Sequence, residues 1–285
     1  MPLLTTTFTA PKILADSLLA LTEAHPEVAL DVGEYPDAAS PLYESCFRYS
    51  LWLPEALQTQ VGAELEALGL PTQTFCVVDE STDYVALTRA NFPPLQVGPY
   101  FITRNDEPVP AGLIGLAVAP NRAFGSGEHA TTEGCLLGYE HRLNEGATFT
   151  HALDFGAGSG ILAFAAAKRQ GTAVLAIDID APSVEICAEN AALNGVGGLI
   201  TCQVGDTPTG EGYDLVFANI LLHPLLELAP QLVASLAKTP EATLILSGFT
   251  TEQGPEIIAK YTALGLRHSW QHQARGWLAH VWRWA

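Results

Sequence analysis

Three closely spaced glycines follow an apolar, strand-like run in the middle of the chain. Gly156, Gly158 and Gly160 stand in the segment His151-Ala-Leu-Asp-Phe-Gly-Ala-Gly-Ser-Gly-Ile-Leu-Ala, which continues as a helix-like pattern. Glycine lets the backbone pass close to a ligand, and a helix N-terminus offers free N–H groups and a partial positive charge. A dinucleotide-binding loop would need its third glycine where this chain has Ile161. The pattern favours another nucleotide-like ligand, and its alternative is a tight strand-to-helix turn that binds nothing.

Acidic residues stand at the end of the next expected strand and shortly after the end of the one that follows it. Asp178 closes one of them, where a carboxylate can accept both ribose hydroxyls of an adenosine lying across the carboxyl edge of the sheet. Asp180 is the better candidate for a helix N-cap, because a proline begins the following helix. Asp206 could meet the adenine amino group or could belong to an ordinary Gly-Asp turn, and the sequence leaves both readings open.

Two further segments combine polar side chains with flexible or strand-end backbone. The stretch Ala123-Phe-Gly-Ser-Gly-Glu-His-Ala-Thr-Thr could fold over a cofactor, with Thr131 or Thr132 bonding its amino-acid portion. It could equally be a loop capped into a helix at 132–138. Asn219 ends the fourth expected strand, and its side-chain carbonyl can accept a hydrogen bond from an amine. His223 follows it, and its position before a proline is more typical of a structural or capping histidine than of a base.

Strands that alternate with helices bring these residues to one edge of a sheet. From residue 111 onward the alternation predicts an α/β domain with a parallel sheet covered on both faces, and two β-type runs at the end predict a terminal antiparallel hairpin. We expect strands at 150–154, 173–178, 199–204, 215–219 and 243–247, helices at 161–169, 183–194, 225–236 and 252–264, and hairpin strands at 266–273 and 277–284.

The first 82 residues follow a different order. Four expected strands (5–9, 28–32, 45–53 and 74–78) enclose two expected helices, near 13–21 and 54–68. This β-α-β-β-α-β order is ferredoxin-like, and such a module can serve packing or recognition without fixing an activity. Residues 83–110 are rich in aromatic residues and proline without a clear period, and we predict that they connect this domain to a second domain at 111–285.

Composition narrows the kind of protein. The chain has 285 residues, of which 48% are hydrophobic and 15% charged, so it is globular and long enough for two domains. Thirteen Lys and Arg against 31 Asp and Glu give a formal charge of −18, which opposes binding to nucleic-acid phosphates and suits a cationic partner, although acidity also serves solubility. Five scattered cysteines without a C-x-x-C pair predict free thiols and no metal site. Without a signal-like N-terminus or an apolar run near ~20 residues, we expect a cytoplasmic protein without a membrane partner.

Taken together, these motifs resemble those of the bacterial ribosomal protein L11 methyltransferase family, within the class I methyltransferases. The resemblance covers roughly residues 83–284, and residues 1–82 match much less. It rests on Asp83-Tyr84, Phe92-Pro-Pro-Leu-Gln-Val-Gly, the loop 123–132, the glycine loop with its acid, the stretch 190–196, Ala218-Asn-Ile-Leu and Leu246-Ser-Gly. The chain departs from the family pattern at Tyr84, Ser126, Ala130 and Ala157.

The resemblance implies both a fold and an activity. The expected fold is a ferredoxin-like domain that recognises the substrate, tethered to a Rossmann-like seven-strand domain. The expected reaction moves methyl groups from S-adenosyl-L-methionine to amino groups of a ribosomal protein, L11 first: lysine side chains, with the N-terminal amine as a further candidate. The resemblance places Thr132, Gly156, Asp178 and Asn219 on the cofactor and Phe124 and Gly127 around the same pocket. Asn219 and the backbone carbonyls beside it would hold the amine, which makes Asn219 the expected catalytic residue.

Other functions remain to be weighed against this one. Another protein lysine or a small-molecule amine could be the substrate. A nicotinamide-dependent oxidoreductase is disfavoured by Ile161 and by the terminal hairpin, and a non-catalytic binding module by the intact set of glycines, Asp178 and Asn219. The expected partner is a basic ribosomal protein, free rather than assembled, with no direct nucleic-acid contact.

Overall fold

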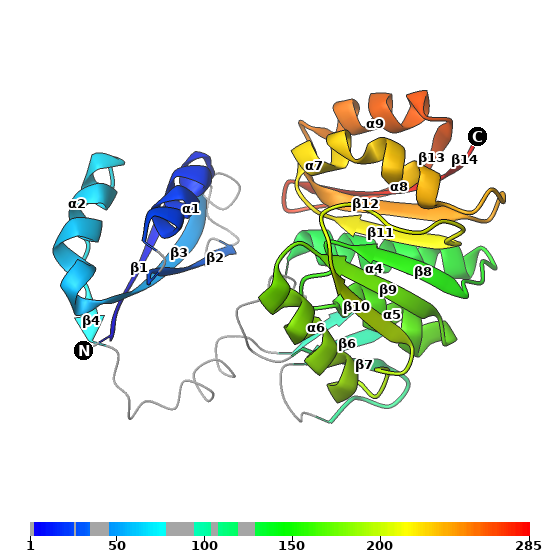
Figure 1. Cartoon of the computed structure of the whole chain (residues 1–285), viewed down its shortest axis with the longest axis horizontal. Coiled ribbons are helices and arrows are strands. Elements are labelled where there is room, and N and C mark those ends of the chain that lie inside the picture. The colour runs from blue at the N-terminus through cyan, green and yellow to red at the C-terminus, as the bar shows by residue number, and fades with distance from the viewer. Residues whose placement is uncertain (1–2, 26, 35–45, 78–93, 104–107, 119–128) are drawn as a thin grey trace. The chain divides into compact units, whose positions relative to one another are not determined.

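A computed structural model describes residues 3–25, 27–34, 46–77, 94–103, 108–118 and 129–285 of the chain. The chain divides into two compact units, Met1–Tyr84 and Val85–Ala285 (Figure 1). Each unit has its own hydrophobic core and is described by itself below.

The first unit is a ferredoxin-like fold. Its elements are β1 (Leu3–Pro11), α1 (Ala15–Ala24), β2 (Ala29–Glu34), β3 (Cys46–Pro54), α2 (Gln58–Ala67) and β4 (Cys76–Val77), with a single 3₁₀ turn before each helix, at Lys12–Leu14 and Glu55–Leu57. The strands form one antiparallel sheet in the order β2-β3-β1-β4. The predicted β-α-β-β-α-β order is therefore confirmed.

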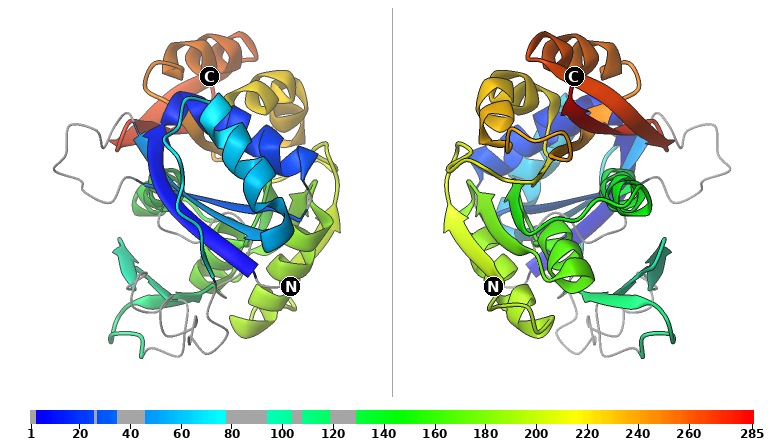
Figure 2. Two further views of the ribbon diagram at one scale, coloured as in Figure 1. Left: turned by 90° about the vertical axis from the view of Figure 1, so that its left-hand side faces the viewer. Right: turned by 90° about the vertical axis from the view of Figure 1, so that its right-hand side faces the viewer.

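Apolar spacing explains why both helices of this unit lie on one face of the sheet (Figure 2). Leu18 of α1 and Val61 and Leu65 of α2 are buried together with alternate residues of β3, Tyr49 and Leu51 among them. Side chains on one face recur every second residue in a strand and every three to four residues in a helix, so apolar residues at these spacings form one shared core. The second helix ends where the sequence predicted, because Gly69 adopts a φ of +81° just beyond it.

The second unit is built on a seven-stranded sheet. Its strands stand in the order β10-β9-β8-β11-β12-β14-β13, and the five from β10 to β12 run parallel, whereas β14 is antiparallel to both neighbours. The bounds are β8 His151–Phe155, β9 Ala173–Asp178, β10 Ile200–Val204, β11 Leu215–Asn219, β12 Thr243–Thr250, β13 Leu266–Ala274 and β14 Trp277–Trp284. The predicted parallel sheet with a terminal antiparallel hairpin is confirmed.

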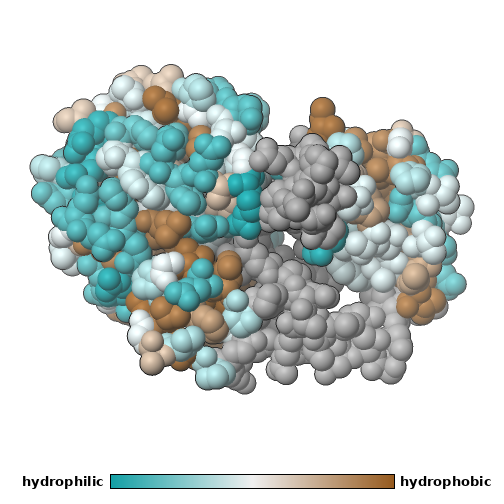
Figure 3. All heavy atoms as spheres, turned by 180° about the vertical axis from the view of Figure 1, so that it is seen from behind, coloured by the Kyte–Doolittle hydropathy of each residue, from teal (hydrophilic) through white to brown (hydrophobic). Residues whose placement is uncertain are grey.

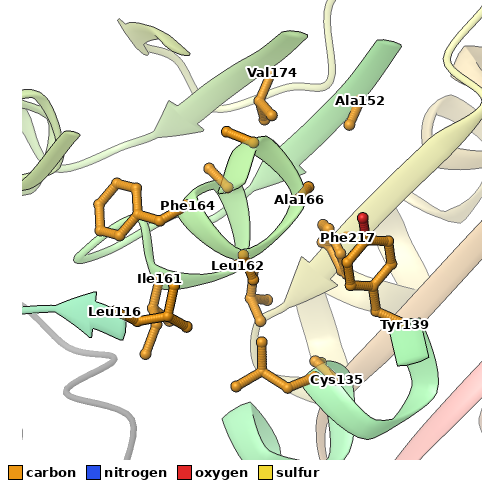
Figure 4. Packing of buried hydrophobic residues seen from close by; sticks show 14 of the residues in the cluster. Leu116, Cys135, Tyr139, Ala152, Ile161, Leu162, Phe164, Ala166, Val174 and Phe217 are labelled. Carbon is orange, nitrogen blue, oxygen red and sulfur yellow. The ribbon is translucent and has the colours of Figure 1, made fainter. Parts of the chain in front are cut away.

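Helices cover both faces of this sheet. One face packs against α4 (Ala130–Asn144), α5 (Ile161–Gln170) and α6 (Ala181–Leu193), and Figure 4 shows the side chains of α4 and α5 meeting those of the strands. The other face packs against α7 (Leu222–Glu227), α8 (Ala229–Ser235) and α9 (Gly254–Ala263). Neighbouring residues of one strand point to opposite sides, as Ala152 and Leu153 do, and both are fully buried. From β8 the chain continues to one side of the sheet through β9 and β10, and it then returns to the other side with β11 and β12. Ligands of such sheets bind at the carboxyl ends of the two strands where this change of direction occurs, here β8 and β11.

The region predicted as the connection, 83–110, contains regular structure. Within it, β5 (Leu95–Val97) and β6 (Tyr100–Thr103) pair with each other, and β6 pairs with β7 (Ile114–Ala117). Tyr100 and Ile102 are buried in the core of the second unit, so this part of the predicted connection belongs to that unit. Strands of three and four residues carry too few positions for an alternating pattern to be recognised.

Two predicted helices have different bounds in the structure. The first helix of the second unit, expected at 132–138, extends over α4, because its glycines allow close packing on β14: a Cβ at Gly134 would lie 2.5 Å from Ala279 Cβ, and one at Gly138 would lie 3.0 Å from Val281 Cγ2. The helix expected at 225–236 is instead two, α7 and α8. Pro230 stands in the first turn of α8, where its missing N–H is tolerated and the preceding helix cannot continue.

Candidate active site

The glycine loop between β8 and α5 is a tight turn. Gly156, Gly158 and Gly160 have φ values of +73°, +52° and +86°, which residues with a side chain rarely adopt. The Gly156 and Ala157 N–H groups donate to the Ile177 carbonyl at 2.8 and 3.0 Å, so the loop is bonded to the adjacent strand β9. These two hydrogen bonds fix the position of the loop backbone at the carboxyl edge of the sheet.

A buried carboxylate supports the helix that follows this loop. The N-cap of α5 is Gly160, which has no side chain to accept from the first-turn N–H groups. Asp154 of β8 takes that role: its Oδ2 accepts from the Ala163 N–H at 3.0 Å. Burial raises the pKa of Asp154 to about 7, opposed by that hydrogen bond and increased by the charge of Asp178. Asp154 was not among the predicted site residues, although an acid in an otherwise apolar strand just before the loop was a usable signal.

Asp178 is bonded directly to the glycine loop. Its Oδ2 accepts from the Gly158 N–H at 2.8 Å, and its Oδ1 accepts from the Asp180 N–H at 3.0 Å. A carboxylate has about four acceptor sites, so each oxygen can accept one further hydrogen bond, such as one from a hydroxyl. Asp180 is the N-cap of α6, as predicted, and accepts from the Ser183 N–H at 2.9 Å and from the Ser183 hydroxyl at 2.7 Å.

The first turn of α4 distinguishes the two candidate threonines. Thr131 is part of the cap: its hydroxyl lies 2.9 Å from Nδ1 of the N-cap residue His129. Thr132 is fully buried, and its hydroxyl has no hydrogen-bond partner among the described residues. His129 also packs edge-on against Trp277, which pairs with the last residue of β12, so this helix end lies at the carboxyl edge of the sheet. Among the described residues, the Thr132 hydroxyl is therefore the one of the two that can still bond to a ligand.

Asn219 is the last residue of β11, one strand away from the glycine loop. Ala218 pairs with Phe155, the residue before Gly156, and the side chain of Ile220 packs directly over Gly156. The Oδ1 atom of Asn219 is buried, and within the described part of the chain it has no hydrogen-bond partner. The structure therefore brings Asn219, the glycine loop and Asp178 to one edge, with an amide oxygen available there.

The remaining predicted residues are less constrained. Gly205 donates to the Asp178 carbonyl at 2.9 Å, so the exposed Asp206 follows close to Asp178, and its contact with adenine stays a prediction. His223 is exposed in α7. Phe124 and Gly127 lie outside the described residues.

The described part of the chain offers no set of ligands for a metal ion. Its His, Cys, Asp and Glu residues contain no group of three or more that could hold a metal ion. All five cysteines are free thiols. No helix in the described ranges is long and apolar enough to cross a membrane.

Comparison with known proteins places this arrangement in a family. The model of the ribosomal protein L11 methyltransferase family matches residues 50–284. The chain belongs to that family. A ribosomal protein L11 methyltransferase of Bradyrhizobium diazoefficiens is 35% identical over 88% of this chain and 81% of its own length, and one of Brucella abortus is 33% identical over 89% and 91%. The crystal structure of a ribosomal protein L11 methylase from Lactobacillus delbrueckii subsp. bulgaricus superposes with a TM-score of 0.59 and 30% identity, over 68% of this chain and 99% of that one.

Membership of the L11 methyltransferase family settles two questions that the sequence left open. The chain is a methyltransferase of the class I fold, so the oxidoreductase and the non-catalytic module are set aside. The match begins at residue 50, within β3 of the ferredoxin-like unit, so it includes part of the region where the motif resemblance was weak.

Proposed function

We propose that this chain transfers methyl groups from S-adenosyl-L-methionine to amino groups of ribosomal protein L11, on lysine side chains first and on the N-terminal amine as a second candidate. The observation that carries the proposal is the amide oxygen of Asn219, which is buried beside the glycine loop without a hydrogen-bond partner from any residue that the structure describes. The names of the family and of its relatives supply the protein substrate.

The described residues fit this cofactor. Buried polar atoms without partners are rare in folded proteins, and those at this edge, Thr132 Oγ1 and Asn219 Oδ1, suit the hydrogen-bonding groups of an amino-acid portion and of an amine. The carboxylate of Asp178 keeps acceptor sites for ribose hydroxyls while it anchors the loop. The residues proposed to hold the cofactor are Thr132, Gly156, Gly158, Gly160, Asp178, Asp206 and Asn219, with Phe124 and Gly127 from outside the described ranges. Thr131, whose hydroxyl contacts the ring of His129, is the second candidate on this helix.

The chain's own task in the reaction is to orient a neutral amine. The bound sulfonium compound supplies an electrophilic methyl group. Asn219 accepts a hydrogen bond from the amine and directs its lone pair along the line of transfer, which is a positioning effect. Lysine has a reference pKa of ~10.4, and a partly desolvated site lined by neutral carbonyls lowers the pKa of the amine. No general base is assigned, because Nδ1 of His129 is engaged in the cap and His223 is exposed.

Charge supports a basic, unassembled protein as the partner. Residues 1–84 contain thirteen Asp and Glu but only two Lys and Arg, so the ferredoxin-like unit is the more acidic part of a chain with a net charge of −18. In the view of Figure 3, hydrophilic residues cover much of the second unit, with hydrophobic patches among them. The negative field of the chain attracts a basic protein and repels the RNA that surrounds it after assembly. We assign substrate recognition to residues 1–82.

Variants of Asn219 test the proposal. With saturating cofactor and free L11, Asn219→Ala should lower kcat at least tenfold, because the amine loses its orienting acceptor. Asn219→Asp keeps an acceptor but adds a negative charge, which stabilises the ammonium form, so its rate profile should shift to higher pH. Unchanged kcat in Asn219→Ala contradicts the role of Asn219. Transfer to an unrelated basic protein or to small amines, but not to L11, would favour the alternative substrates instead.

A further inference from the structure

The residue after Asn219 is locked between two glycines. A Cβ at Gly156 would lie 2.1 Å from Ile220 Cγ2, so only glycine leaves room for that side chain. On the other side, a Cβ at Gly248 would lie 2.0 Å from the Ile220 carbonyl oxygen. Gly248 has a φ of +97° and stands where the pairing of β12 with β14 shifts register, a bulge that opens space beside the strand. The chain therefore leaves β11 along one fixed path.

That path presents a leucine to solvent. Leu221 is extended (φ −65°, ψ 160°) and is the N-cap of α7, where its carbonyl accepts from the Leu225 N–H at 3.2 Å. Its side chain is 65% exposed. Both backbone neighbours are fixed, by the glycine seat of Ile220 on one side and by the helix on the other. A contact made by this side chain therefore costs little backbone entropy.

Leu221 also lies within reach of a substrate held at Asn219. Two residues span at most about 7 Å, which limits the distance between the Cα atoms of Asn219 and Leu221. A lysine side chain carries its amine on a stem of four methylene groups, and such stems pack along apolar surface. Because the two Cα atoms are this close, a stem whose amine meets the Asn219 amide oxygen can lie alongside Leu221.

We propose that Leu221 is a specificity-determining residue that packs against the aliphatic stem of the lysine being methylated. The assignment rests on the proposed function and adds the apolar part of the substrate to it. Contact with the stem favours long, unbranched primary amines over short ones and over an α-amine, which has no stem. The contribution is to substrate binding, and the amine itself is still held by Asn219.

A matched pair of leucine variants tests the assignment. Leu193, at the end of α6, is 58% exposed and serves as the control for Leu221. Leu221→Ala should raise the KM for free L11 about tenfold with little change in kcat or in the Kd for S-adenosylhomocysteine. Leu221→Met, which keeps an unbranched apolar side chain, should restore most of the loss, and Leu193→Ala should resemble the wild type.

Linear alkylamines provide a readout that isolates the contact with the stem from the rest of the protein substrate. The series from propylamine to hexylamine is tested in competition with L11. Each added methylene should strengthen inhibition of the wild type about two- to fourfold, and fourfold corresponds to full burial of the methylene, ~0.8 kcal/mol. In Leu221→Ala this dependence on length should be nearly flat. The same length dependence in both proteins, or equal KM values for Leu221→Ala and Leu193→Ala, overturns the assignment alone. Absence of transfer to L11 by the wild type overturns the proposed function, and this assignment with it.

Discussion

The carboxylate of Asp178 has two functions that one substitution removes together. It accepts from the Gly158 N–H and, in the proposed function, from the ribose hydroxyls of the cofactor. Hydrogen bonds to a charged group contribute ~1.5–3 kcal/mol, whereas a loop N–H left without its acceptor costs ~1–3 kcal/mol of folding stability in the free and the bound protein alike. Asp178→Ala should therefore weaken cofactor binding by about 1.5–3 kcal/mol, which is a factor of roughly 10–10² in Kd.

Asp180 offers a control of the same charge two positions away. It caps α6 through Ser183 and has no proposed contact with the cofactor. Loss of an N-cap costs about 1 kcal/mol of stability, so Asp180→Ala should lower the unfolding temperature while its Kd stays within about twofold of the wild-type value. Asp178→Asn keeps the shape and one acceptor, and its Kd should fall between those of the wild type and Asp178→Ala.

Calorimetric titration with S-adenosylhomocysteine, combined with thermal unfolding of each variant, separates the two effects. Asp178→Ala should lose much of its affinity for S-adenosylhomocysteine, and Asp180→Ala almost none. Equal affinities in the two variants would refute this expectation, because a general loss of negative charge or of stability would then account for both.

Three further outcomes are expected. Because folding raises the pKa of Asp154 to about 7, the folded state holds an extra proton between about pH 4 and pH 7. The free energy of unfolding of the wild type, relative to that of Asp154→Asn, should therefore fall by roughly 2–4 kcal/mol as the pH rises through that range, which urea unfolding at a series of pH values measures. A fragment of residues 85–285 should bind S-adenosylhomocysteine like the full chain but lose methylation of L11, and full activity of the fragment would contradict the recognition role of residues 1–82. The apparent second-order rate on free L11 should fall as salt rises, since exposed charges are screened over ~8 Å at physiological salt, whereas Asn219→Ala should lower the rate without changing that salt dependence.

Local patterns predicted the elements with strong periodicity and clear end signals. Asp180 before a proline marked the start of a helix, because capping depends on a few neighbouring residues. The carboxyl-edge position of Asp178 and Asn219 followed from strand order alone. These features need only the chain near the residue in question.

Features set by contacts between distant segments could not be predicted. The length of α4 depends on Gly134 meeting Ala279, which lies far away in the sequence. The choice of Thr132 over Thr131 depends on the ring of His129, which engages the Thr131 hydroxyl. Gly248 was noted only as part of a family motif, and its reason, the carbonyl of Ile220, becomes visible only once β11 and β12 are paired. Such approaches carry no periodic signal in the sequence.

The central claim is that this chain moves methyl groups to amine nitrogens of free L11. The most direct measurement mixes the purified protein with methyl-labelled S-adenosylmethionine and free L11, and locates the label by tandem mass spectrometry. We expect label on lysine side-chain nitrogens, with the N-terminal amine as the second site, and much less label when L11 is supplied in assembled large subunits. Label on oxygen or sulfur atoms, or no label on free L11 under any salt condition, would contradict it.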